Sequence, residues 1–141
     1  MTREELEGFR KAYQKSAKKS IKAENAQGKP VNEQSDWVWF DRDSFQKLLD
    51  MTDPKIGGVK IYFGQYDKNN MSMLPEDRKN REEYIGMVSV ALVACDKTAK
   101  EYKDIYSEVS TDTDLKTESL ESGDGTSPMN AGDLCPPSCN P

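Results

Sequence analysis

Apolar residues recur along this chain in two spacings, and each spacing predicts one kind of element. Near the N-terminus they recur every three or four residues, which is typical of an amphipathic helix over residues 2–25. Thr2 as N-cap and Glu5 three residues later predict a capping box. We expect this helix to pack on the rest of the domain through one stripe: Leu6, Phe9, Tyr13, Ala17 and Ile21.

Three other segments have the composition of strands. Residues 36–40, Asp-Trp-Val-Trp-Phe, are apolar on both faces and predict a short strand buried on both sides. Residues 58–65 alternate cleanly and predict a second strand. Residues 84–95 predict a third strand, or a longer one bent at Gly86, because β-branched residues dominate their centre. A buried helix is the alternative for this last segment.

A short helix is predicted between the first two strands. Asp43 is its expected N-cap, with Gln46 at the capping-box position. The connection, residues 41–57, is long enough for a crossover between parallel strands. The predicted fold is therefore α+β: an N-terminal amphipathic helix, a small mixed sheet of three or more strands with a short crossover helix, and an irregular C-terminal tail. Its expected hydrophobic nucleus consists of Trp39, Phe45, Leu48, Ile61, Phe63 and Val90.

Composition divides the chain into three parts. Residues 1–106 are expected to form a single α+β domain, because the apolar residues cluster there. Residues 107–130 are rich in Ser, Thr, Asp, Glu and Gly, which predicts a flexible acidic linker. Residues 131–141 form a separate tail with the sequence Cys-Pro-Pro-Ser-Cys at its centre.

Charge is distributed unevenly over a net value of −5. Residues 1–30 carry eight Lys/Arg and four Asp/Glu, whereas residues 101–141 carry two and nine. Glutamates interrupt the lysines of the first helix, so nucleic acid is not the expected partner. No stretch is apolar enough for a membrane span. If residue 1 is the true start, no leader precedes it, and a cytoplasmic location is predicted.

The three cysteines bear on both location and chemistry. An odd number favours a reducing compartment over a disulfide framework. Cys135 and Cys139 either pack as small apolar side chains where the tail docks on the domain, or form a redox pair. A complete zinc site is not expected, since the chain has no histidine and only Cys95 remains as a further thiol ligand.

The absence of histidine also removes the commonest general base. Catalysis through Ser–His or Cys–His pairs is therefore excluded within this chain. Asp36, Asp41 and Asp43 cluster around the first strand and are an alternative divalent-metal site, although helix capping explains them more simply. No cofactor is predicted, and the balance leans away from an enzyme.

The remaining hypothesis is a protein-interaction surface. Tyr and Arg are enriched at interfaces, and four such residues lie on the second strand and the loop after it. The sequence thus favours a small non-enzymatic interaction or regulatory module with an unidentified protein partner and no indicated oligomeric state. A carboxylate-based metal or small-ligand protein or enzyme is the alternative, and a thiol switch is a weaker one. The predicted partner-binding residues are Tyr62, Tyr66, Arg78 and Arg81.

Two regions of the chain resemble a group of small uncharacterised proteins from Bacteroidetes-type bacteria. The resemblance rests on Val38-Trp-Phe-Asp41, the segment 45–49, Gly58-Val-Lys-Ile-Tyr-Phe-Gly-Gln-Tyr66 and Gly132-Asp-Leu-Cys-Pro-Pro-Ser-Cys139. Those proteins share a strand–helix–strand core and a Cys-Pro-Pro-x-Cys tail. The resemblance implies a bacterial source and a tail that belongs with the core, and it carries over no functional residue.

Overall fold

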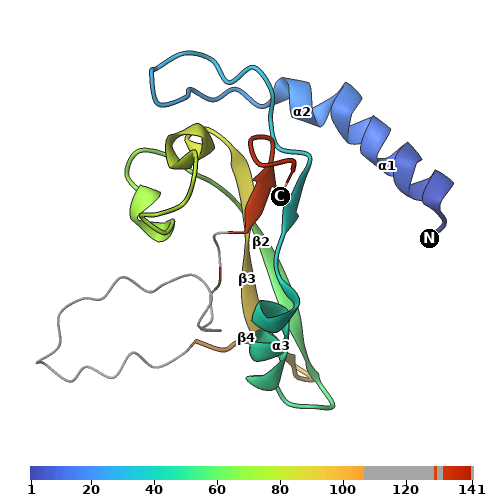
Figure 1. The fold of residues 1–141 in the computed structure, drawn as a ribbon. Helices are drawn as coiled ribbons and strands as arrows, with labels where there is room; N and C mark the ends of the chain where they lie inside the picture. Colours follow the sequence, from blue (N-terminus) through green and yellow to red (C-terminus); the bar gives the residue numbers. More distant parts are fainter. Residues whose placement is uncertain (107–128, 130–131, 141) are drawn as a thin grey trace, which may run out of the picture.

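A computed structural model describes residues 1–106, 129 and 132–140 of the chain (Figure 1). The predicted linker 107–130 therefore lies outside the described residues except for Met129. The described elements confirm a mixed α+β fold. In chain order they are α1 (Arg3–Lys15), α2 (Ala17–Ser20), β1 (Trp37–Trp39), α3 (Arg42–Asp50), β2 (Gly57–Gln65), the 3-10 helices η1 (Met71–Met73) and η2 (Arg81–Tyr84), β3 (Val88–Lys97), β4 (Tyr102–Asp104) and β5 (Asp133–Cys135).

Two antiparallel sheets form the body of the molecule. The first has the strand order β2-β3-β4, and the second pairs β1 with β5. The predicted mixed sheet with parallel pairing of the first two strands is therefore wrong. The tail supplies β5, the partner of β1. The whole length of β2 pairs with β3, from Gly57 opposite Asp96 to Gln65 opposite Val88.

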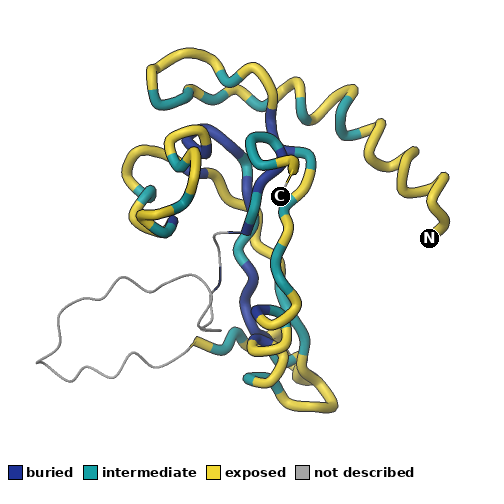
Figure 2. The backbone as a smooth tube through the Cα atoms, viewed as in Figure 1, coloured by how far each residue is buried: buried dark blue, intermediate teal, exposed yellow. Residues whose placement is uncertain are grey.

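The N-terminal helix begins as predicted but does not pack as predicted. Thr2 and Glu5 form the reciprocal capping box, with the Glu5 amide 3.2 Å from Thr2 Oγ1. The helix breaks at Ser16, so residues 2–25 do not form one element. No residue of α1 is buried, and the helix projects from the body (Figures 1 and 2). Leu6 and Phe9 of its apolar stripe are exposed, because amphipathic spacing encodes a face without supplying a partner for it. Tyr13, near the end of the helix, is half-buried, and its hydroxyl donates to the Ser35 carbonyl at 2.9 Å.

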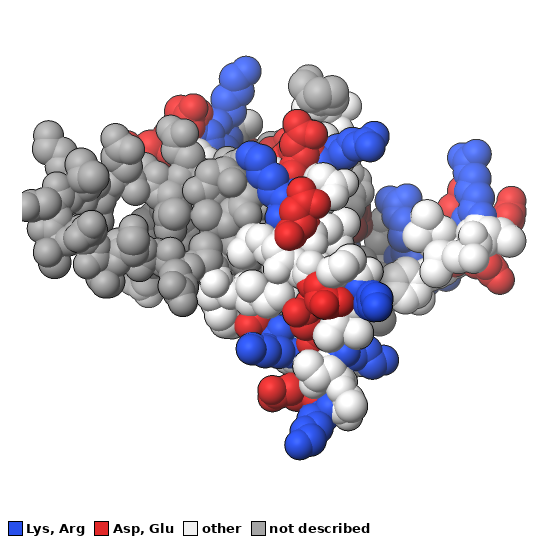
Figure 3. All heavy atoms as spheres, turned by 90° about the horizontal axis from the view of Figure 1, so that it is seen from below, with Lys and Arg blue, Asp and Glu red and all other residues white. Residues whose placement is uncertain are grey.

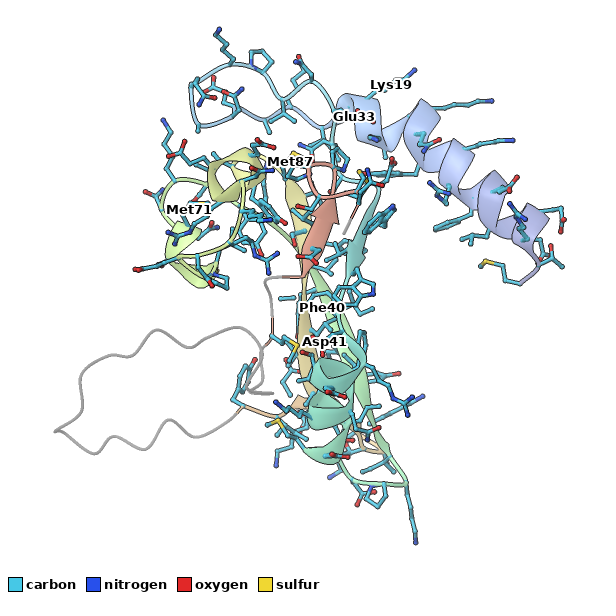
Figure 4. The ribbon with its side chains drawn as sticks, in the orientation of Figure 1. Lys19, Glu33, Phe40, Asp41, Met71 and Met87 are labelled. Atoms are coloured by element: carbon cyan, nitrogen blue, oxygen red, sulfur yellow. A yellow bond between two sulfur atoms is a disulfide. The ribbon has the colours of Figure 1, made fainter. Side chains whose placement is uncertain are left out.

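Helix α3 starts two residues earlier than the sequence analysis predicts. Asp41, not Asp43, is its N-cap: Asp41 has extended backbone dihedrals, and its carboxylate accepts from the Ser44 amide at 2.8 Å. Figure 4 shows Phe40 and Asp41 where the chain passes from β1 into α3. Phe40 packs edge-to-face on Phe45 with ring centroids 6.0 Å apart, which anchors this junction.

The third strand is confirmed as a strand, but it begins at Val88 instead of residue 84. Gly86 lies before it with φ of 87°, a conformation that side chains rarely adopt. A Cβ there would lie 2.5 Å from the carbonyl oxygen of Glu24. Gly86 therefore allows two distant segments to touch and turns the chain into β3.

The core consists of two clusters rather than the predicted nucleus. Of that nucleus only Leu48 is buried; Trp39, Ile61 and Phe63 are exposed, and Phe45 and Val90 are half-buried. Other residues take their place, several of them from the predicted third strand and others from the loops and the tail. The Tyr84 cluster contains Tyr66, Leu74, Tyr84, Met87 and Leu134. The Leu48 cluster contains Leu48, Leu92, Ala94 and Met129.

Candidate functional site

A hollow in the described surface lies beside β1. It has a volume of about 660 Å³, and both tryptophans of the chain line it. Its walls come from β1, from the loop between the two 3-10 helices, and from β5 with the residues that follow it. We call it the tryptophan cleft; it is lined by Trp37, Trp39, Pro75, Asp77, Arg78, Lys79, Tyr84, Asp133, Ser138, Cys139 and Asn140.

Strand alternation places the two tryptophans, which both line this cleft, on the same side of β1. Val38 packs against the Tyr84 cluster, so its neighbours on either side point the other way. Trp37 is 42% exposed and Trp39 is 56% exposed, which corrects the prediction that this strand is buried on both sides. One face of β1 packs on the Tyr84 cluster through Val38, and the other face, which carries the tryptophans, stays partly open to solvent.

The floor of the cleft is a fully buried tyrosine held by polar contacts. The Tyr84 hydroxyl lies 3.2 Å from Arg78 Nη1 and 3.3 Å from Ser138 Oγ. Arg78 also stacks over the Tyr84 ring and forms an ion pair with Asp133 at 2.6 Å. The guanidinium thus connects the loop wall to the β5 wall, and it gives the floor a defined shape before any ligand binds.

The tail forms the third wall of the cleft. Cys135 and Cys139 are joined in a disulfide, and the Ser138 amide donates to the Leu134 carbonyl at 2.7 Å. The two cysteines are therefore not free packing thiols, and the cysteine count no longer argues for a reducing compartment. Cys95 is the free cysteine; it is buried, and loss of solvation raises the pKa of its thiol.

Gly132 lets the tail approach β1 closely. A Cβ at this position would lie 2.5 Å from Val38 Cγ1 and 2.8 Å from the Trp39 carbonyl oxygen. The carbonyl of Gly132 accepts from Arg78 Nη1 at 3.4 Å. This glycine thus serves both the docking of β5 and the floor of the cleft.

The four predicted partner-binding residues do not form one surface. Arg78 lines the tryptophan cleft, while Tyr66 is buried in the Tyr84 cluster, with its ring 5.9 Å from that of Tyr84. Arg81 donates to the carbonyl of Met71 and borders a second hollow of about 550 Å³. Tyr62 lies on the sheet, away from both.

Tyr62 belongs to a polar network on one face of the sheet. Its hydroxyl donates to Asp104 at 2.7 Å, and the same carboxylate pairs with the ammonium group of Lys60 at 2.5 Å. Two hydrogen bonds lower the pKa of Asp104: the one from Lys60 has the larger effect, and the one from Tyr62 has the next largest. The network links β2 to β4 across β3 and explains Tyr62 as a structural residue.

The three aspartates proposed as an alternative metal site have separate roles. Asp36 pairs with Lys18 at 3.0 Å; burial opposes its ionisation, but hydrogen bonds from Lys18 and Gln14 outweigh burial and lower its pKa. Asp41 caps α3, and Asp43 is exposed in the first turn of that helix. Within the described ranges, no three acidic or cysteine side chains converge as metal ligands.

Charges of both signs alternate on the face that Figure 3 shows. In the N-terminal helices, Lys18 contacts both Glu33 and Asp36. This distribution offers no extended basic surface on that face for a nucleic-acid backbone. None of the helices in the described part of the chain has both the length and the apolar character needed to cross a membrane.

Sequence reasoning missed the cleft because it assigned the tryptophans to the core. The available signal was the alternation in Trp37-Val38-Trp39, which puts both indoles on the same side of a strand. This alternation does not indicate which side of the strand the rest of the protein covers. Comparisons of the chain with protein-family models, with curated proteins and with solved structures found no match.

Proposed function

We propose that this chain is a non-enzymatic bacterial interaction module that holds a segment of a protein partner in the tryptophan cleft. The observation that supports this is the exposure of both tryptophans on one wall of a preformed hollow. Tryptophan is the residue type most enriched among the side chains that dominate binding energy at interfaces. Leaving large indole surfaces in water is otherwise unfavourable.

The chemistry of the lining supports a partner segment with an apolar anchor side chain. The indoles of Trp37 and Trp39, together with Pro75, provide an apolar wall, and Arg78 already forms an ion pair with Asp133. The exposed Asp77 and Lys79 at the loop provide hydrogen-bonding groups of both signs around it. Such an arrangement, an apolar centre with a polar rim, is that of protein interfaces.

The chain's tryptophan content provides a direct test. Because both tryptophans line the cleft, intrinsic fluorescence reports its occupancy without a label. Peptides selected from a random displayed library on the full chain should quench or shift this fluorescence on binding. Replacing Trp39 by Ala should weaken their binding at least tenfold, about 1.4 kcal/mol. Trp37→Ala should have an effect in the same direction.

The matched control for this test is Phe9→Ala, which removes an exposed aromatic side chain from α1. It should leave peptide affinity unchanged. If selected peptides bind Trp37→Ala and Trp39→Ala as tightly as the wild-type chain, the tryptophan cleft is not the binding surface. A loss confined to Phe9→Ala would move the surface to α1.

A small ligand is the second candidate occupant. The volume of about 660 Å³ lies within the range of about 300–1,000 Å³ that small-molecule sites occupy. The same fluorescence titration with a panel of small metabolites separates the two functions. Saturable binding of a metabolite that competes with the selected peptides would favour a small-ligand function.

The cytoplasmic location expected from the sequence is part of the proposal and is tested separately, by fractionation of the source cells.

A further inference from the structure

The outer edge of β2 is open. In the three-stranded sheet β2 is a terminal strand, and within the described residues no other segment pairs with its outer side. Ile61 and Phe63, at its centre, are 56% and 85% exposed. A long edge with exposed apolar side chains is the usual template for pairing with another strand.

Hydrogen bonds at the two ends of β2 show which backbone groups face outward. The Lys97 amide donates to the Ile56 carbonyl at 2.8 Å, and the Tyr66 amide donates to the Met87 carbonyl at 3.1 Å. Residues with even numbers therefore bond to β3, since the direction alternates along a strand. The amides and carbonyls of Val59, Ile61 and Phe63 point to the open edge.

The other side of the sheet is occupied. Leu92 of β3 exchanges two backbone hydrogen bonds with Met129, and the Ile105 amide donates to the Ala94 carbonyl at 2.8 Å. Nearer the start of β3, the Ser35 hydroxyl donates to the Val88 carbonyl. Among the described residues, β2 is therefore the long open edge of this sheet, because β4, the strand at the other end, has only three residues.

The residue types of β2 are symmetric about Ile61 except for one unlike pair, Lys60 and Tyr62. Reading outward from this residue in both directions gives Lys60 and Tyr62, then Val59 and Phe63, then Gly58 and Gly64. In an antiparallel pair related by a two-fold axis through Ile61, each position meets its counterpart from the second copy. Apolar residues then face apolar residues, and glycine faces glycine, which makes the edge self-complementary.

The hydrogen-bonding pattern fits the same register. Ile61 would face its own copy, and Val59 would face Phe63 of the second copy, all as hydrogen-bonded pairs with outward-pointing groups. Lys60 would face Tyr62 of the second copy in a close non-bonded pair. Within one chain the Lys60 ammonium already lies 5.7 Å from the Tyr62 ring centroid, so these two side chains are compatible neighbours.

Lys60 does not keep the β2 edge from pairing with another strand. Lysine on an edge strand discourages pairing, but Lys60 is bound to Asp104 of its own chain. We propose that two copies of this chain pair through their β2 edges, antiparallel and centred on Ile61. The product is a continuous antiparallel sheet with the order β4-β3-β2-β2-β3-β4. This inference does not rest on the proposed function of the tryptophan cleft.

Charged substitutions of Ile61, the residue at the two-fold axis, test the pairing. Residue 61 would face itself, so Ile61→Lys places two like charges opposite each other, as does Ile61→Glu. Sedimentation of the full chain should give a dimer for the wild type, and either variant should raise the dissociation constant at least tenfold. An equimolar mixture of the two variants should restore a dimer, which shows that both are folded.

Leu49→Lys is the matched control, because it adds the same charge at a partly exposed apolar position on α3. It should sediment as the wild-type chain does. A wild-type chain that is monomeric at all concentrations would overturn the proposal, whether the edge is then free or covered by another part of the same chain. Dimers that persist unchanged in both charged variants would overturn it as well.

Cysteine substitutions test the register. Paired residues in such a strand pair have Cα atoms about 5.5 Å apart, within disulfide reach. Ile61→Cys should therefore form a covalent dimer under mild oxidation. Phe63→Cys should not, because its two copies would lie about 13 Å apart along the strands. Crosslinking of the Phe63→Cys variant without crosslinking of Ile61→Cys would contradict the register.

Discussion

Asp41 and Asp43 differ in whether they cap helix α3, although they lie only two residues apart. Both are helix-capping residue types two positions apart, and the sequence analysis favours Asp43. In the structure the Asp41 carboxylate receives hydrogen bonds from the amide and hydroxyl of Ser44, which lower its pKa. The cap belongs to the residue whose backbone is still extended, and Asp43 has already entered the helix.

The two aspartates therefore predict different mutational effects. Asp41→Ala should lower the free energy of unfolding by about 1 kcal/mol, because two N-terminal donors of α3 lose their acceptor. Asp43→Ala should change it by less than about 0.5 kcal/mol. Urea unfolding followed by tryptophan fluorescence measures both. Equal losses for the two variants would contradict the assignment of the cap.

At the scale of elements, β5 and its disulfide link form the wall of the cleft. Trp37 lies opposite Cys135 in the β1–β5 register, so the state of the cysteines bears directly on a cleft tryptophan. Cys139 is exposed, whereas Cys135 and Cys95 are buried. An external thiol is therefore expected to attack at Cys139, and Cys95 should stay unreactive in the folded chain.

Reduction of the folded chain should add the mass of two hydrogen atoms and make tryptophan fluorescence more easily quenched by acrylamide. The reason is that Ser138, Cys139 and Asn140 lose the disulfide cross-link that holds them against β5 and no longer shield the cleft. The Cys139→Ser variant should show the more accessible fluorescence from the start and no response to reductant. An unchanged mass on reduction would mean that the disulfide does not form.

At the scale of the whole molecule, the core joins segments that are far apart in sequence. Leu134 of the tail packs with Tyr84 and Tyr66, and Met129 packs with Leu48 and Leu92. Helix α1, although the longest helix described, contributes no buried residue. Stability therefore depends on the last residues of the chain more than on the first.

This distribution predicts a contrast between two leucines. Leu134→Ala should lower the free energy of unfolding by about 2–5 kcal/mol, because Leu134 is 0% exposed and its removal leaves a cavity. Leu6→Ala, on the exposed stripe of α1, should change it by less than about 0.5 kcal/mol. Denaturant titration of both variants measures the contrast. A Leu134→Ala chain as stable as the wild type would mean that the tail is not part of the core.

Local features of this protein followed from the sequence alone. The Thr2–Glu5 capping box, the helix between the first two strands and the strand character of 58–65 all depend on interactions within a few residues. Backbone dihedrals, helix caps and side-chain alternation have short range, so a short stretch of chain specifies them.

Long-range pairing decided which apolar faces are covered. That Trp37 and Trp39 line a cleft, that Phe63 stands on an open edge and that Leu134 is buried depends on β5 meeting β1 and β3 meeting β2. Burial is a property of two surfaces, and an amphipathic pattern describes only one of them. The partner of each face became visible only when distant segments were placed together.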